Sequence, residues 1–177
     1  MACGRPRRVA IVGNAGTGKS TLAEDIGRLL GLDPVPLDRL LWKPGWEIVP
    51  ESEFAQAHDA LIRGEHWLFD GLGYPSTLEA RIGSADAVIF TRYALWRCYW
   101  WALKRELGGR RAGRPGNSAP PPARLVRSIR STQRNLVPLL DEILERHSAT
   151  TRVHVLRSPR ALPALMAEIR GWSASAA

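Results

Sequence analysis

The fold is decided by one stretch of the sequence, Val9-Ala10-Ile11-Val12-Gly13-Asn14-Ala15-Gly16-Thr17-Gly18-Lys19-Ser20. Its first four residues are apolar and mostly β-branched, which predicts a buried strand of a parallel sheet. Its last eight residues match the Walker A pattern at every fixed position. Apolar residues then recur with helical spacing up to Leu30, and Gly31 suits the end of that helix. Because strand, glycine loop and helix follow in the order that the motif requires, this stretch predicts a phosphate-binding loop.

The residue types of this loop suit a nucleoside triphosphate. Its glycines let successive backbone N–H groups turn inward on phosphate oxygens, at a helix N-terminus that also attracts anions. We expect Lys19 to neutralise the β and γ phosphates and the Ser20 hydroxyl to ligate Mg²⁺. The residues expected to bind the nucleotide here are Gly13, Asn14, Ala15, Gly16, Thr17, Gly18, Lys19, Ser20 and Thr21.

Beyond this stretch, strand-like and helix-like segments alternate along the chain. We predict strands at 33–37, 66–69, 85–90 and 153–156, and helices at 51–63, 76–82, 93–107 and 162–169, with a long helix from 123 that bends or breaks at Pro138. The alternation predicts an α/β fold, a three-layer sandwich with a five-stranded parallel sheet. We expect a single domain over 1–172 and a disordered tail at 173–177.

The composition favours an anionic partner. The chain has 25 basic and 17 acidic residues, a net charge of +8, and much of the excess is arginine between Arg92 and Arg134. Such charge suits a phosphorylated small molecule, a nucleic acid or an acidic membrane surface. Cys3 and Cys98 fit neither a metal-ligand spacing nor a disulfide framework, and no apolar run is long enough to cross a membrane. We therefore expect a cytoplasmic protein without a membrane partner.

A basic segment at 108–122, rich in glycine and proline, cannot continue the helix before it. We predict a lid that folds over phosphates, with Arg110 and Arg114 in catalytic roles, because closure would exclude water and stabilise the transferring charge. The alternative is a solvated basic loop. Farther on, one face of the predicted helix carries four arginines, which either bind phosphate or face solvent: Arg124, Arg127, Arg130 and Arg134.

Asp70 follows the predicted strand at 66–69, at the edge of the sheet where the phosphate loop also lies. Since a triphosphate site needs a nearby carboxylate for its metal, we predict that Asp70 holds Mg²⁺ together with Ser20. The alternative is a turn-forming role before Gly71. Asp86 is a weaker candidate for this metal site, because it stands at the start of its predicted strand and so lies at the opposite, amino end of the sheet.

Two further segments, Leu37-Asp38-Arg39-Leu40-Leu41-Trp42-Lys43-Pro44-Gly45-Trp46 and Trp67-Leu68-Phe69-Asp70-Gly71, resemble those of the adenylate kinase-related P-loop proteins known as DNA topology modulation proteins. The resemblance covers most of the chain. It implies the nucleoside monophosphate kinase type of P-loop NTPase fold, ATP with Mg²⁺, and an arginine-bearing lid. It also implies that Arg157, after the last strand, belongs to the loop that contacts adenine.

The resemblance places the acceptor pocket near Asp38, at the expected carboxyl end of a strand, where ligands bind in open α/β sheets. There Asp38 would orient or deprotonate a substrate hydroxyl. The alternative is that Asp38 caps a helix beginning at Arg39.

Together these patterns predict a small kinase that transfers the γ-phosphoryl group of ATP to a nucleotide or another small acceptor, with Lys19, Asp38, Arg110 and Arg114 as catalytic residues. Two other functions stay open. One is a basic, ATP-dependent protein associated with nucleic acid. The other is a non-catalytic nucleotide-binding regulator, since Leu72-Gly73 and Thr91-Arg92-Tyr93 depart from the family's pattern.

Overall fold

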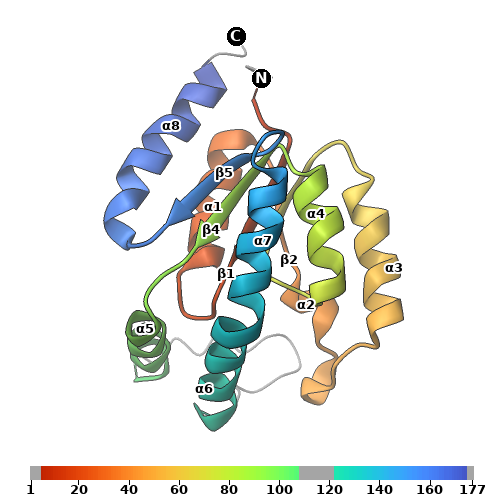
Figure 1. Cartoon of the computed structure of the whole chain (residues 1–177), viewed down its shortest axis with the longest axis vertical. Helices are drawn as coiled ribbons and strands as arrows, with labels where there is room; N and C mark the ends of the chain where they lie inside the picture. Colours follow the sequence, from red (N-terminus) through yellow and green to blue (C-terminus); the bar gives the residue numbers. More distant parts are fainter. Residues whose placement is uncertain (1–4, 108–121, 175–177) are drawn as a thin grey trace.

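The computed structural model describes residues 5–107 and 122–174. In these residues, five parallel strands form one sheet in the order β2-β3-β1-β4-β5 (Figure 1). The strands are β1 (Arg8–Gly13), β2 (Pro34–Pro36), β3 (Trp67–Asp70), β4 (Ala87–Thr91) and β5 (Arg152–Leu156). The α/β class and the five-stranded parallel sheet predicted from the sequence are confirmed.

The central strand β1 is fully enclosed. Val9, Ala10, Ile11 and Val12 expose none of their surface, because strands β3 and β4 pair with both edges and helices cover both faces. A continuous apolar run is what a strand buried on both faces requires. The P-loop therefore begins from a rigid strand in the middle of the sheet.

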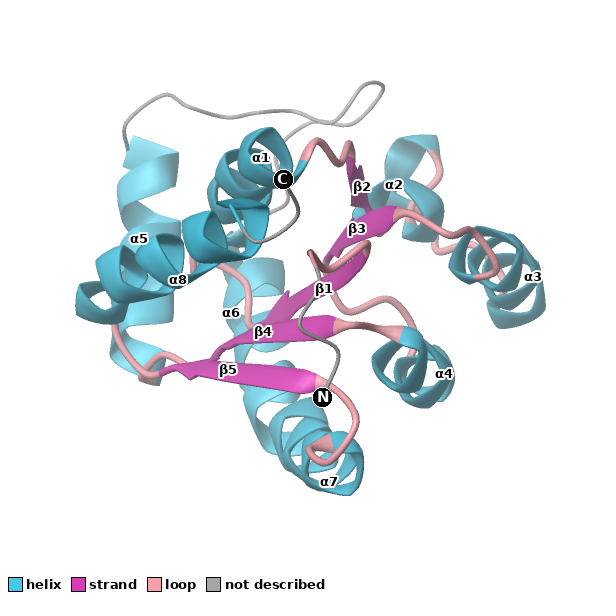
Figure 2. Cartoon of the chain, turned by 90° about the horizontal axis from the view of Figure 1, so that it is seen from above, coloured by secondary structure: helices cyan, strands magenta, loops and turns pink. Residues whose placement is uncertain are grey.

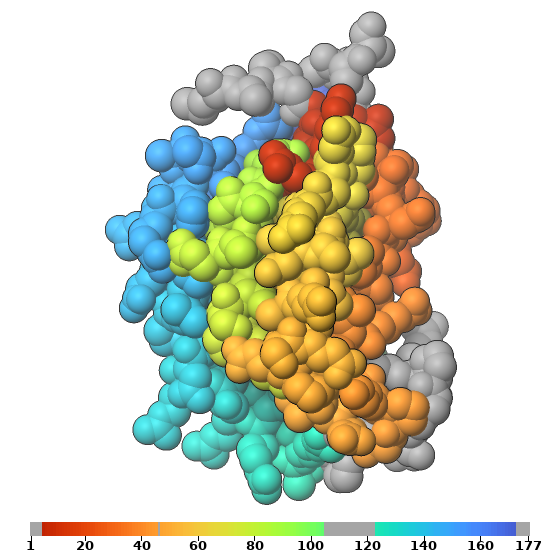
Figure 3. Space-filling model, turned by 90° about the vertical axis from the view of Figure 1, so that its right-hand side faces the viewer, coloured from red at the N-terminus to blue at the C-terminus, as the bar shows by residue number. Residues whose placement is uncertain are grey.

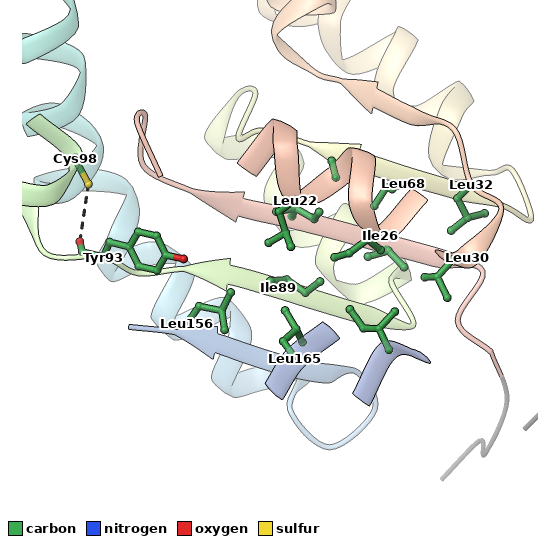
Figure 4. Packing of buried hydrophobic residues seen from close by; sticks show 14 of the residues in the cluster. Leu22, Ile26, Leu30, Leu32, Leu68, Ile89, Tyr93, Cys98, Leu156 and Leu165 are labelled. Atoms are coloured by element: carbon green, nitrogen blue, oxygen red, sulfur yellow. Dashed lines mark hydrogen bonds between the residues drawn. The ribbon is translucent and has the colours of Figure 1, made fainter. Parts of the chain in front are cut away.

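Helices form a layer on each face of the sheet (Figure 2). Helices α1 (Lys19–Leu30) and α8 (Leu162–Ala174) cover one face, and α3 (Glu51–Ile62), α4 (Leu78–Ser84) and α7 (Val137–His147) cover the other. Figure 4 shows the first interface, where Leu22, Ile26 and Leu30 of α1 pack against the sheet near Ile89. The two apolar clusters make the predicted three-layer sandwich.

Three helices lie at the carboxyl end of the sheet, away from both termini: α2 (Asp38–Leu41), α5 (Leu95–Leu107) and α6 (Pro122–Ser131) (Figure 1). A π turn over Thr132–Leu136 joins α6 to α7. Pro138 follows this turn. Because proline lacks an N–H group and its ring clashes with the carbonyl of Arg134, four residues earlier, the helix cannot continue undistorted. The helix predicted to bend or break at Pro138 continues past it as α7, and its distortion is the π turn just before the proline.

Some predicted boundaries were wrong. The strand predicted at 33–37 is only Pro34–Pro36, because its two prolines cannot donate ladder hydrogen bonds, and it lies at the edge of the sheet. Helix α2 follows it, where the sequence offered a helix from Arg39 only as an alternative. Helix α8 extends to Ala174, so residues 173 and 174 belong to it, whereas 175–177 of the predicted tail lie outside the described residues. In the described part of the chain, no helix is long and apolar enough to cross a membrane.

Candidate functional site

The P-loop, Gly13 to Ser20, turns between β1 and α1, and close packing requires glycine at two of its positions. A Cβ atom on Gly13 (φ 142°) would collide with the Thr91 hydroxyl and lie 2.7 Å from the Thr91 carbonyl oxygen. A Cβ atom on Gly16 (φ 77°) would lie 2.6 Å from the carbonyl oxygen of Cys98 in α5. Both positions need glycine for its backbone conformation and for space.

Side chains from distant segments hold the loop in place. The Asn14 side chain, 3% exposed, donates from Nδ2 to the carbonyl oxygen of Ile129 in α6 at 2.9 Å. The Thr17 hydroxyl donates to the Asn14 carbonyl oxygen at 2.9 Å and lies 2.8 Å from the Thr91 hydroxyl at the end of β4. In the sequence, Thr91 stands out only because it departs from a family pattern. Its buried hydroxyl in fact links β4 to the P-loop.

Lys19 and Ser20 lie at the start of α1, with their polar ends near the carboxyl edge of the sheet. Lys19 Nζ donates to the Asn14 carbonyl oxygen at 2.7 Å. The Ser20 hydroxyl donates to Asp70 Oδ2 at 2.6 Å, although the two residues are 50 positions apart. Asp70 ends β3 and is 6% exposed. The structure thus brings together the two residues that the sequence predicts as magnesium ligands.

Asp38 lies at the same carboxyl end of the sheet, just after β2, the strand that pairs with β3. The Leu37 N–H donates to the Asp70 carbonyl oxygen at 2.8 Å, which fixes the start of α2 beside the end of β3. Asp38 is half-buried and is itself the first residue of α2, and Leu37 is the cap position without a side-chain cap bond. The capping alternative for Asp38 is therefore wrong, because the helix begins one residue earlier than that alternative required.

Helix α6 contacts the residue directly after α2, Trp42, at the carboxyl end of the sheet. The Arg124 guanidinium lies over the Trp42 ring, 4.8 Å from its centroid. Arg124, Arg127, Arg130 and Arg134 are all exposed. Arg157 is exposed directly after β5. Arg110 and Arg114 lie outside the described residues.

Asp86 lies at the amino edge of the sheet, as the sequence predicts. Burial alone would raise the pKa of Asp86, but hydrogen bonds from the backbone N–H groups of Arg7 and Arg8 and from the Arg8 guanidinium outweigh it and lower the pKa. This carboxylate holds the N-terminal segment to β4 and lies far from the P-loop. It is a structural group.

Comparison with known proteins gives a result at the level of the fold. No family model matches the chain, and no curated protein sequence matches it. Among solved structures, a shikimate kinase from Acinetobacter baumannii in complex with shikimate superposes with a TM-score of 0.59 at 14% identity, covering 92% of this chain and 90% of that one. A gluconokinase from Sinorhizobium meliloti 1021 superposes with a TM-score of 0.54 at 16% identity, covering 97% of this chain and 92% of that one.

The chain has the P-loop kinase fold of these proteins. The match extends over nearly the whole of each chain, and the sheet order and the strand–loop–helix unit fit it. The nucleoside monophosphate kinase-like fold expected from the sequence is confirmed at this level. The finer resemblance to DNA topology modulation proteins is not confirmed by these comparisons.

Proposed function

We propose that this protein is a small ATP-dependent kinase that transfers the γ-phosphoryl group to a small acceptor, a nucleotide or another compound with a hydroxyl or phosphate group. The observation that carries the proposal is the 2.6 Å contact between Ser20 and Asp70 beside a complete Walker A loop. A hydroxyl and a carboxylate held together next to a triphosphate cradle suit Mg²⁺, which favours oxygen ligands and keeps phosphate oxygens and waters among them. The overall likeness to a shikimate kinase and a gluconokinase supports it.

The residues of the P-loop would have separate roles in binding the phosphates and Mg²⁺. Backbone N–H groups would bind the phosphates, and Lys19 would exchange the Asn14 carbonyl oxygen for the β and γ phosphates. Ser20 and Asp70 would hold Mg²⁺, which supplies charge neutralisation at the phosphates when bound. Arg157 would lie on the adenine side, and Arg110 and Arg114 would reach the transferring group from the predicted lid.

On the opposite side, α2, residues 71–74 and α4 form what we call the acceptor side. Asp38 would orient the acceptor hydroxyl and accept its proton as the acceptor oxygen bonds to the γ-phosphorus. The bond from that phosphorus to the β–γ bridging oxygen breaks, and ADP leaves. Catalysis would rest on positioning and on charge stabilisation.

A phosphoryl-transfer screen tests this function. Purified protein with ATP and Mg²⁺ is incubated with nucleoside monophosphates, sugars, sugar acids and cyclic hydroxy acids, and mass spectrometry identifies any phosphorylated product. Lys19→Ala is the matched control for contaminating kinases. We expect one class of acceptor to be phosphorylated by the wild type alone; products formed equally by both proteins, or by neither, would reject the proposal.

The exposed arginines of α6 favour a second candidate, an ATP-dependent protein associated with nucleic acid. Salt separates the two functions. A protein that binds nucleic acid displaces counterions from its phosphates, so the affinity falls steeply as ionic strength rises. Binding of an acceptor in a partly buried site responds much less.

A further inference from the structure

Arg81, in α4, is a charged side chain enclosed in the protein. It exposes none of its surface, and burial lowers the pKa of its guanidinium to about 9. Nη2 donates to the Leu72 carbonyl oxygen at 2.6 Å. Nε and Nη1 are also buried, and neither has a hydrogen-bond partner in the part of the chain that the structure describes. The guanidinium therefore has two donors that no described residue satisfies.

The surroundings of Arg81 do not compensate for its charge. Among the described residues, no carboxylate forms an ion pair with it. The charge of Arg81 also acts on His58 of α3, whose pKa is lowered first by burial and further by that charge. His58 Nε2 is buried, and no described residue hydrogen-bonds to it. A buried charge is costly unless it is paired, so this arrangement is suited to receiving an anion.

The location of Arg81 connects it to the candidate site. Its hydrogen-bond partner among the described residues, Leu72, is two residues after Asp70. Leu72 lies between Gly71 and Gly73, whose φ angles are positive, 121° and 64°. The space-filling view in Figure 3 looks onto this side of the molecule, where the surfaces of α3 and α4 adjoin. The guanidinium thus lies behind a short glycine-flanked segment at the carboxyl edge of the sheet, under the acceptor side.

We infer that Arg81 binds a carboxylate or phosphate group of the phosphoryl acceptor, so that the acceptor is an anionic hydroxy compound. The inference rests on the proposed function. The Leu72 carbonyl oxygen occupies one N–H group in the ligand-free protein, and rotation at Gly71 and Gly73 would let the anion reach the planar fork of donors. Arginine is suited to this role because its fork matches the two oxygens of such a group.

A direct test observes the Arg81 Nε–H group by ¹H–¹⁵N NMR, with the signal assigned by its absence in Arg81→Lys. The P-loop is first saturated with a nonhydrolysable ATP analogue and Mg²⁺, so that added anions cannot bind there. Sodium acetate and sodium sulfate are then titrated, with sodium chloride at equal ionic strength as the control. We expect a saturable shift with acetate or sulfate. The same small drift in all three salts would overturn the inference.

Kinetics provide the second test once the screen yields an acceptor. We expect Arg81→Lys to raise the KM for that acceptor roughly 10- to 100-fold, because charge-assisted hydrogen bonds in the correct geometry are lost. The KM for ATP should stay within about twofold, which a general structural defect would not allow. Arg63→Gln, which removes an exposed charge at the end of α3, is the matched control and should change neither value.

The two tests separate two kinds of failure. If the wild type phosphorylates no compound, the proposed function fails, and the NMR titration still decides whether Arg81 binds anions. If an acceptor is found but Arg81→Lys changes its KM and that of ATP equally, Arg81 only supports the fold and the inference is wrong. Circular dichroism and thermal unfolding establish whether the variant is folded.

Discussion

The P-loop is made of consecutive residues, whereas the proposed acceptor side is assembled from two parts, α2 and the segment after β3 with α4, which α3 and β3 separate along the chain. In the proposed function, backbone N–H groups would do most of the nucleotide binding, and the side chains of Asn14 and Thr17 hold the loop backbone in shape. On the acceptor side, the candidate groups are side chains, Asp38 and Arg81, whose positions depend on tertiary packing. A phosphate group is common to all nucleotides, so its cradle can be a short motif. An acceptor varies between enzymes, so its site depends on the whole fold.

The largest expected effect is that of a substitution on the nucleotide side, at Lys19. Lys19→Ala should lower kcat/KM about 100- to 1,000-fold, because the mutation removes a positive charge from the transferring phosphate. The fold should be unaffected, since the Asn14 carbonyl oxygen keeps its bond from Thr17 when Lys19 is removed. Calorimetric titration with ATP and thermal unfolding measure the two quantities. Unchanged ATP affinity would contradict the role assigned to the P-loop.

The shape of the loop can be tested with two glycines that share a positive φ. Gly13→Ala would bring a Cβ atom against Thr91, whereas a Cβ atom on Gly45 (φ 81°) would meet nothing within 4 Å. We expect Gly45→Ala to cost about 1–2 kcal/mol for its backbone conformation alone. Gly13→Ala should cost roughly 2–3 kcal/mol more because of the collision. Urea unfolding of both variants measures the difference in the free energy of unfolding. Equal losses of stability would show that Thr91, at the end of β4, moves aside without a measurable cost.

The two aspartates distinguish the metal from the acceptor. Asp70→Asn should reduce Mg²⁺-dependent turnover roughly 10- to 100-fold and raise the Mg²⁺ concentration required, because one ligand loses its charge. Asp38→Asn should lower kcat for the acceptor at an unchanged magnesium requirement. Magnesium titrations of activity for both variants test this division. If both variants shift the magnesium requirement equally, the two carboxylates do not have separate roles.

These contrasts also explain which parts of the molecule could be predicted from its sequence. The P-loop and the layer order were predictable, because each depends on local patterns: a glycine motif, and buried runs alternating with helical periodicity. The pairing of Ser20 with Asp70 was predictable as well, because parallel strands end at the same edge of a sheet. Helix α2 could be offered only as an alternative, because four residues are too few to show a period.

Arg81 was missed for a different reason. In the sequence it stands in Leu78-Glu79-Ala80-Arg81-Ile82, where an arginine on a short helix suggests a solvated position. Its burial results from the packing of α4 beside α3 and the segment after β3, which no local pattern encodes. The same holds for Thr91, whose link to Thr17 depends on the pairing of β4 with β1.

The smallest expected effect tests the buried charge beneath the acceptor side. His58 is fully buried, and its pKa is lowered by desolvation and by the charge of Arg81, while Asp59 opposes the shift. The unfolded chain, where the pKa is 6.5, therefore binds more protons than the folded chain as the pH falls below that value. The contribution of His58 to folding stability therefore decreases with acidification, and His58→Gln should lessen the decrease in stability between pH 7.5 and 5.5.

His66→Gln is the control, because His66 is exposed and lies one residue before β3. Urea unfolding at several pH values compares the slopes of stability against pH, so a uniform loss of stability in His58→Gln does not affect the comparison. If an anion binds Arg81, it should offset the positive charge near His58 and flatten the slope of the wild type, with no such change in His58→Gln. Equal slopes for the wild type and His58→Gln would show that the pKa of His58 is not lowered in the folded protein.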